Sequence, residues 1–104
     1  MKYCFLLIFI FSKTSNAQNK FINLSPATFS NSFSLNISPV LSINPGDTVS
    51  TETIDAMGYD KNSVKRQKGG NPLTGPFYVN GAQAGDIIAV TLNKVALNRN
   101  YAHT

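Results

Sequence analysis

The chain has 104 residues, a formal net charge of +4 and a single cysteine, Cys4. This length supports at most one small domain, which buries so little apolar surface that its stability alone would be marginal without a partner, a metal or a disulfide. One cysteine excludes an internal disulfide. The basic residues at positions 61–68 have no aromatic residues between them, a pattern that argues against nucleic-acid binding.

The N-terminus has the three parts of a secretory leader. Lys2 supplies a positive start, an apolar run extends over residues 5–11, and Ser15-Asn16-Ala17 places small residues before a cleavage site. The run is too short to span a bilayer, which takes roughly 20 apolar residues. We therefore expect a signal peptide over residues 1–17, cleavage after Ala17, a periplasmic or secreted product of residues 18–104, and no stable membrane anchor.

The first half of the mature chain is predicted to hold two strands and a turn. Phe33, Leu35 and Ile37 alternate with polar residues, the period of a half-buried strand. Asn44-Pro45-Gly46-Asp47 is a strong turn signal, because proline fixes φ and glycine accepts positive φ. It leads into residues 48–54, a β-branched run that predicts a second strand.

The second half repeats this construction after a long loop. Glycines and prolines between Tyr59 and Gly75 forbid regular structure and favour a shaped loop. Gln83-Ala84-Gly85-Asp86 is a second Gly-Asp turn, and residues 87–92, apolar at almost every position, predict a strand buried on both faces. Together these elements predict an all-β or β-rich fold.

Few residues are candidates for chemistry. Asp55 stands where a predicted strand passes into a loop, so it is either a functional carboxylate or a cap that accepts backbone hydrogen bonds. Glu52 is three positions earlier, which places it on the other face of an unbroken strand. Asp47 and Asp86 are explained by their turns. His103 is interpreted as a surface residue or the end of a loop, and no catalytic triad can be assembled.

Four segments resemble, in order and spacing, the N-terminal motifs of the acetamidase/formamidase family. They are Pro45-Gly46-Asp47-Thr48-Val49, Glu52-Thr53-Ile54-Asp55-Ala56, the run from Asn71 to Ala82, and Gly85-Asp86-Ile87-Ile88-Ala89-Val90. Each segment alone is weak evidence, but four in register over the same stretch are specific. The resemblance extends from about Leu24 to the end of the chain.

The resemblance implies the N-terminal portion of a larger amidase fold, partly sandwich-like or barrel-like. It implies hydrolysis of short amides such as formamide or acetamide to ammonia and a carboxylate, with a divalent metal ion, zinc or calcium, and a homo-oligomeric full-length protein. Asp55 carries over as a metal ligand, and Glu52 as a weaker second ligand. Asn71, Gly75, Pro76 and Gly81 would form the loop architecture of the site.

The chain also departs from the family pattern. Asn80 stands where an acidic residue is usual, and the histidine and glutamate residues that complete the metal and acid/base set are expected beyond Thr104. We therefore expect residues 18–104 to be an incomplete site, inactive and marginally folded alone. The alternative is a short secreted β-module that binds a ligand or a partner subunit without catalysis.

Overall fold

The computed structural model describes residues 18–103, so the predicted signal peptide lies outside the described residues. Four short strands are present: β1 (Phe21–Leu24), β2 (Leu41–Ile43), β3 (Thr48–Thr51) and β4 (Phe77–Val79). This part of the chain has no helix, which confirms the β-rich prediction, and its strands do not close into a barrel. Among these residues there is accordingly no helix long and apolar enough to cross a membrane.

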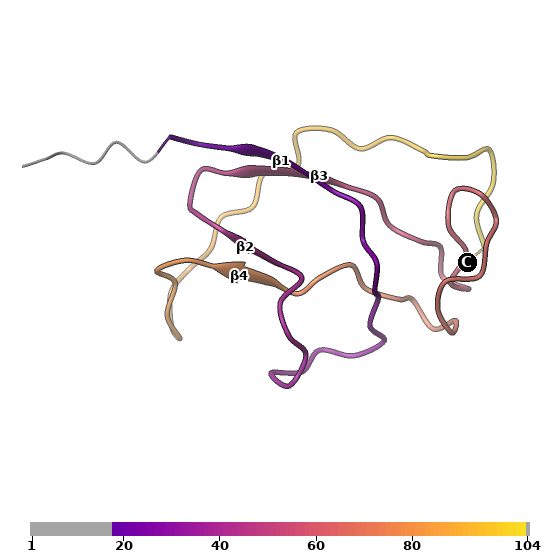
Figure 1. The fold of residues 1–104 in the computed structure, drawn as a ribbon, viewed down its shortest axis with the longest axis horizontal. Coiled ribbons are helices and arrows are strands. Elements are labelled where there is room, and N and C mark those ends of the chain that lie inside the picture. Colours follow the sequence, from indigo (N-terminus) through magenta and orange to yellow (C-terminus); the bar gives the residue numbers. More distant parts are fainter. Residues whose placement is uncertain (1–17, 104) are drawn as a thin grey trace, which may run out of the picture.

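The strands form two separate parallel pairs. β1 pairs with β3, with Ile22 opposite Val49, and β2 pairs with β4, with Ser42 opposite Tyr78. Figure 1 shows the two pairs lying near each other, while the long loops gather at the opposite end of the molecule beside the C-terminus. Parallel strands cannot be joined by a tight hairpin, so the pairing itself requires long connections, and these connections carry the candidate site.

The two Gly-Asp turns are the same structure used twice. In the first, the Asp47 N–H donates to the Asn44 carbonyl (3.0 Å) and the Asn44 N–H donates to Asp47 Oδ2 (2.8 Å). In the second, Asp86 and Gln83 make the same two bonds at 3.0 and 2.8 Å. Gly46 and Gly85 have φ of 92° and 96°, as the third residue of a type II turn requires. The structural interpretation of Asp47 and Asp86 is confirmed.

Three strand predictions need correction. The predicted strand at residues 33–37 is wrong: a turn replaces it, in which the Ile37 N–H donates to the Ser34 carbonyl (3.3 Å). The prediction of a strand at residues 87–92 is also wrong, because the segment has no strand partner among the described residues. The strand predicted for residues 48–54 ends at Thr51. Alternation marks a face that suits a sheet, but a partner strand decides whether a sheet forms.

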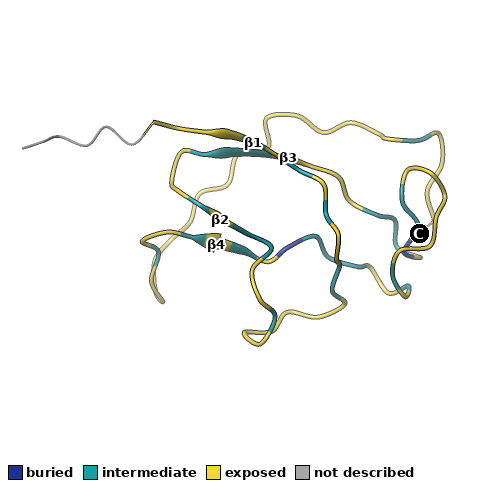
Figure 2. Cartoon of the chain, viewed as in Figure 1, coloured by how far each residue is buried: buried dark blue, intermediate teal, exposed yellow. Residues whose placement is uncertain are grey.

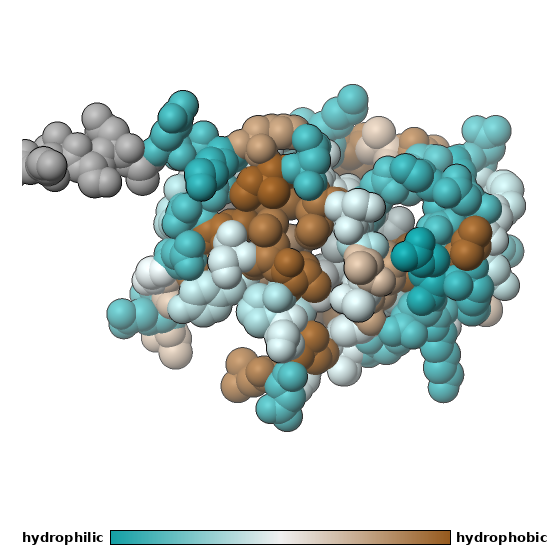
Figure 3. Space-filling model, in the orientation of Figure 1, coloured by the Kyte–Doolittle hydropathy of each residue, from teal (hydrophilic) through white to brown (hydrophobic). Residues whose placement is uncertain are grey.

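The described residues have almost no buried core. None of their large hydrophobic side chains is buried, and the two buried residues are glycines, Gly58 and Gly75. Figure 2 accordingly shows the chain as mainly intermediate and exposed. In Figure 3, apolar residues gather on the visible face over the two strand pairs, open to solvent. Stability must therefore come mainly from backbone pairing and from polar contacts between loops.

Candidate functional site

Among residues 18–103, the least exposed ion pair is centred on the Asp55 carboxylate. Its Oδ1 accepts hydrogen bonds from the backbone N–H groups of Met57 (3.0 Å) and Tyr59 (2.9 Å). Its Oδ2 accepts from the His103 N–H (3.1 Å) and forms an ion pair with the Arg99 guanidinium. The Asp55 side chain is 2 % exposed. This aspartate therefore closes its own loop with one oxygen and holds a distant segment with the other.

The loop that Asp55 closes is built a second time by Asp60. Asp60 Oδ1 accepts from the N–H groups two and four positions later, Asn62 (2.9 Å) and Val64 (3.0 Å), as Asp55 Oδ1 does. Asp60 Oδ2 also faces an arginine, Arg66, at 3.3 Å. Side chains of aspartate commonly replace a backbone acceptor in this way. The two carboxylates differ in burial, since the Asp60 side chain is 16 % exposed.

Electrostatics favour the ionised form of Asp55. Burial of the carboxylate would raise its pKa, but the donated N–H groups of Tyr59 and His103 and the charge of Arg99 oppose that effect and hold the pKa of Asp55 well below its usual range. The pKa of Asp60 is also lowered, chiefly by the backbone N–H of Val64. Asp55 is thus a permanent anion at neutral pH, already neutralised by Arg99.

Residues 99–103 lie against the two Asp loops through further contacts. The Ala56 N–H donates to the His103 carbonyl (3.3 Å), and Arg99 Nη1 donates to the Asp60 carbonyl (3.0 Å). The His103 ring lies near two tyrosine rings, with centroid distances of 5.6 Å to Tyr59 and 6.2 Å to Tyr101. We call Asp55, Tyr59, Arg99, Tyr101 and His103 the Asp55 cluster.

The cluster contains residues that the sequence did not identify as site residues. His103 is exposed, as its interpretation as a surface residue or loop end predicted, and its backbone N–H is in addition bonded to the candidate carboxylate. Arg99 lies 44 positions from Asp55 in the sequence and His103 lies 48 positions away. No local pattern reports contacts at such a separation; the only available signal was that the sequence has a single histidine.

Glu52, the weaker of the two predicted ligands, has a different partner. Its carboxylate forms an ion pair with Lys61 at 2.7 Å, and its side chain is 49 % exposed. The Glu52 carbonyl accepts a hydrogen bond from Thr74 Oγ1 (3.3 Å), which ties this position to the Asn71–Ala82 segment. Within residues 18–103 no hydrogen bond or ion pair joins Glu52 to Asp55.

The predicted ligands do not fit a divalent ion as they are placed. A carboxylate offers about four lone-pair sites, and those of Asp55 are directed at four donors. A metal ion at Asp55 would have to displace Arg99. The described part of the chain also has no group of three or more histidine, cysteine, aspartate or glutamate side chains placed to hold a metal. What the cluster does chemically is fix the position of His103.

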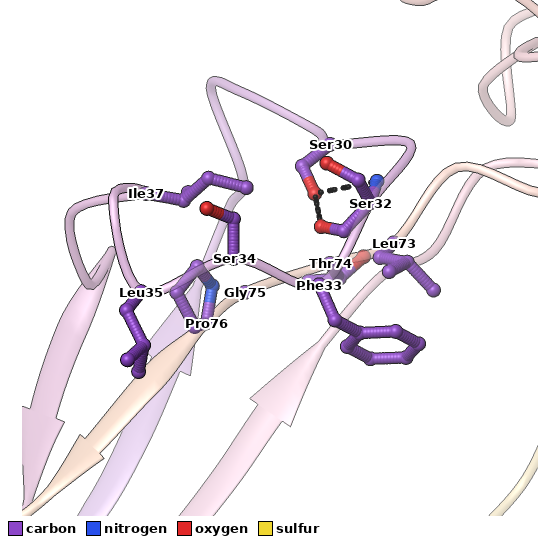
Figure 4. A pocket seen from close by; sticks show the side chains of 10 residues that line it. All are labelled: Ser30, Ser32, Phe33, Ser34, Leu35, Ile37, Leu73, Thr74, Gly75 and Pro76. Atoms are coloured by element: carbon purple, nitrogen blue, oxygen red, sulfur yellow. Dashed lines mark hydrogen bonds between the residues drawn. The ribbon is translucent and has the colours of Figure 1, made fainter.

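The predicted loop residues are spread over three places. Asn71 lies beside the Asp55 loop, with its N–H donating to the Ala56 carbonyl (3.1 Å). Gly75 and Pro76 line an apolar hollow of about 380 Å³ opposite residues 30–37, drawn in Figure 4. Gly81 borders a second hollow of about 460 Å³, which Pro45 and Gly46 of the first Gly-Asp turn also line. Neither hollow is lined by Asp55 or His103.

Gly75 and Gly81 are required for their backbone conformation. No close neighbour excludes a side chain at either position: a Cβ at Gly81 would have nothing within 4 Å, and one at Gly75 would meet the Phe77 ring at an ordinary 3.6 Å. Their φ values of 82° and 124° are what require glycine.

Comparison with known proteins identifies the family. A search of curated proteins and a search of solved structures each give no match. The model of the acetamidase/formamidase family matches residues 16–103, a span that includes the four motif segments, the Asp55 cluster and the loop between them. The chain belongs to the acetamidase/formamidase family.

Proposed function

We propose that this chain is part of an exported hydrolase that cleaves short linear amides to ammonia and a carboxylate. The observation that carries the proposal is the family match, which extends over all of the described residues. Export is inferred from the pattern at residues 1–17.

Within this proposal His103 is the one proton-transferring residue that this chain contributes, and the rest of the acid/base set lies outside it. Amide hydrolysis requires one group to accept a proton from the attacking water and one to deliver a proton to the leaving amine. His103 is the only histidine of the sequence. Its ring lies against Tyr59 and Tyr101, and its backbone is bonded to Asp55. Asp55 is then a positioning residue that acts through His103.

The metal ion remains a prediction from the resemblance. Asp55 and Glu52 are engaged by Arg99 and Lys61, so we assign no metal-bound step to either residue. If zinc or calcium takes part, we propose that its main ligands come from outside residues 18–103, together with the rest of the acid/base set. This proposal predicts that residues 18–104 alone are inactive.

The proposal is tested by ammonia release from formamide and acetamide. The assay compares the 104-residue chain with the product of the reading frame continued beyond codon 104, each with and without added zinc or calcium. We expect activity in the longer product only, with His103→Gln lowering kcat by about 10²-fold or more, the scale of acid/base catalysis.

Three outcomes would count against the proposal. Ammonia release by the short chain would show that its site is complete. An inactive longer product would remove the amidase assignment. A stop codon at position 105 followed by unrelated sequence would favour the non-catalytic secreted β-module, for which the exposed apolar side chains of the described residues would be the binding surface.

A further inference from the structure

The proposed export leaves a glutamine at the new N-terminus, directly before the first contacts of the fold. Gln18 follows Ala17, the last residue of the predicted signal peptide, so cleavage there gives Gln18 a free α-amino group. Gln18 is exposed, and within residues 18–103 no hydrogen bond involves it. Its amine and its side-chain amide are therefore both free to react with each other.

The two residues that follow are bound to the first Gly-Asp turn. The Lys20 N–H donates to Asp47 Oδ1 (2.8 Å), and the Lys20 carbonyl accepts from the Thr48 N–H (2.8 Å). The Asn19 side chain packs so closely on Gly46 that an added Cβ there would clash with Asn19 Oδ1. These contacts lead directly into the pair of β1 and β3. Only one exposed residue therefore separates the predicted cleavage site from the residues that hold this pair.

An N-terminal glutamine contains both groups of a cyclisation reaction. The α-amino nitrogen attacks the side-chain carbonyl carbon Cδ and forms the N–Cδ bond of a five-membered lactam, while the Cδ–Nε2 bond breaks and ammonia leaves with one proton of the amine. No other reactant is consumed. An α-amino group has a pKa of about 7.7–8.0, so near neutral pH part of it is the neutral nucleophile. The nearby Asp47 carboxylate is occupied, because both of its oxygens already accept backbone N–H groups.

We propose that Gln18 cyclises to pyroglutamate once the leader is removed, and that the lactam protects the start of β1 from aminopeptidases, which require a free α-amino group. Trimming past Lys20 would remove both of its bonds to the first turn. No residue beyond Thr104 takes part, because both reacting groups belong to Gln18. The proposal rests on the proposed export, since it needs cleavage after Ala17, and it is independent of amide hydrolysis.

The first test is the intact mass of the exported product. The 104-residue chain is expressed in a bacterium with a Sec pathway, recovered from the periplasm or the medium, and incubated at neutral pH. We expect a chain that begins at residue 18 and is lighter than the unmodified sequence by one ammonia, and fragmentation of the intact chain should place this loss on residue 18. Gln18→Asn is the matched control. It keeps an amide, but its ring closure would give a strained four-membered lactam, so it should lose no ammonia at this position.

The second test measures protection. An aminopeptidase should trim Gln18→Asn and leave the wild-type chain intact until a pyroglutamyl peptidase removes the lactam. Trimming past Lys20 should accelerate hydrogen exchange at the Thr48 amide, which loses its acceptor.

The outcomes separate the modification from export. A product cut after Ala17 that keeps the Gln18 amide would overturn the modification and leave export standing. A product that still carries residues 1–17 would refute both. Equal trimming of the wild-type chain and Gln18→Asn would overturn the protective role.

Discussion

Two glycines with nearly the same positive φ allow backbone strain and steric clash to be measured separately. Gly58 lies inside the Asp55 loop with φ of 88°, and Gly81 lies in the turn after β4 with φ of 82°. Replacing either by alanine places a Cβ in the left-handed region, which costs roughly 1–2 kcal/mol. That cost is common to both variants.

The surroundings of the two positions differ sharply. At Gly81 an added Cβ meets nothing within 4 Å, so Gly81→Ala should lose only the conformational term. At Gly58 the Cβ would lie 2.0 Å from the Gln67 carbonyl oxygen and 2.8 Å from its carbon. These are backbone atoms that cannot rotate away, and the Gly58 carbonyl itself accepts the Arg66 N–H (2.8 Å). We expect Gly58→Ala to cost more than about 4 kcal/mol, the exceptional end of single substitutions.

Amide hydrogen exchange measures both effects locally, without requiring a cooperative global transition. In Gly81→Ala we expect exchange to accelerate about 5–30-fold at the Ala82 amide, which donates to the Val79 carbonyl at 3.2 Å. In Gly58→Ala the amides of Arg66 and Gly70, bonded to the carbonyls of Gly58 and Ala56, should lose their protection altogether. Similar, modest acceleration at both sites would show that the predicted clash is absent and that the loop is placed wrongly.

Further predictions concern the ion pairs and export. Arg99→Lys should release residues 99–103, because Arg99 reaches the Asp60 carbonyl and the Asp55 carboxylate with two different nitrogens and a lysine has only one. Loss of NOEs between the rings of the Asp55 cluster would report this release. Lys61→Ala removes only the half-exposed pair with Glu52 and should change stability by less than about 1 kcal/mol in a denaturant titration. The pKa of Asp55 in the folded chain lies below its unfolded value of about 3.9. The stabilisation from ionised Asp55 should therefore be complete above about pH 3.9 and be lost only as the pH falls below that value. The same NOEs should persist at pH 5, and their loss between pH 7 and 5 would contradict the assigned contacts. Intact mass of the product exported by a bacterium should give Gln18 as the first residue, and retention of the leader would refute the signal peptide.

Local signals predicted the turns and the beginning of β3, but they failed for the other strands. Pro45, Gly46 and Asp47 fix their turn within four residues, so the sequence was sufficient for it and for its second copy at Gly85-Asp86. β2 and β4 are three-residue strands that exist because they pair with each other across a long connection. Nothing in either segment alone reports that partner. The alternating residues 33–37 show the converse, a strand-like pattern that has no partner.

The sequence predicted the central residue of the candidate site, Asp55, but not its distant partners. Asp55 was identified because it follows a β-branched run, and both of its interpretations concern that position. The structure shows the backbone capping that one of them predicted, at Met57 and Tyr59. The ion pair with Arg99 and the bond from His103 join segments more than 40 positions apart, and only the folded chain reveals them.

The claim that Asp55 positions His103 is tested most directly by ring NOEs in wild type and Asp55→Asn. Asparagine keeps the shape but has one acceptor oxygen, so it cannot serve the loop amides and also accept from Arg99 and the His103 N–H. We predict NOEs between the Tyr59 and His103 rings, 5.6 Å apart by centroid, in wild type and their loss in the variant, with β2–β4 NOEs unchanged. Unchanged Tyr59–His103 NOEs in Asp55→Asn would contradict the account.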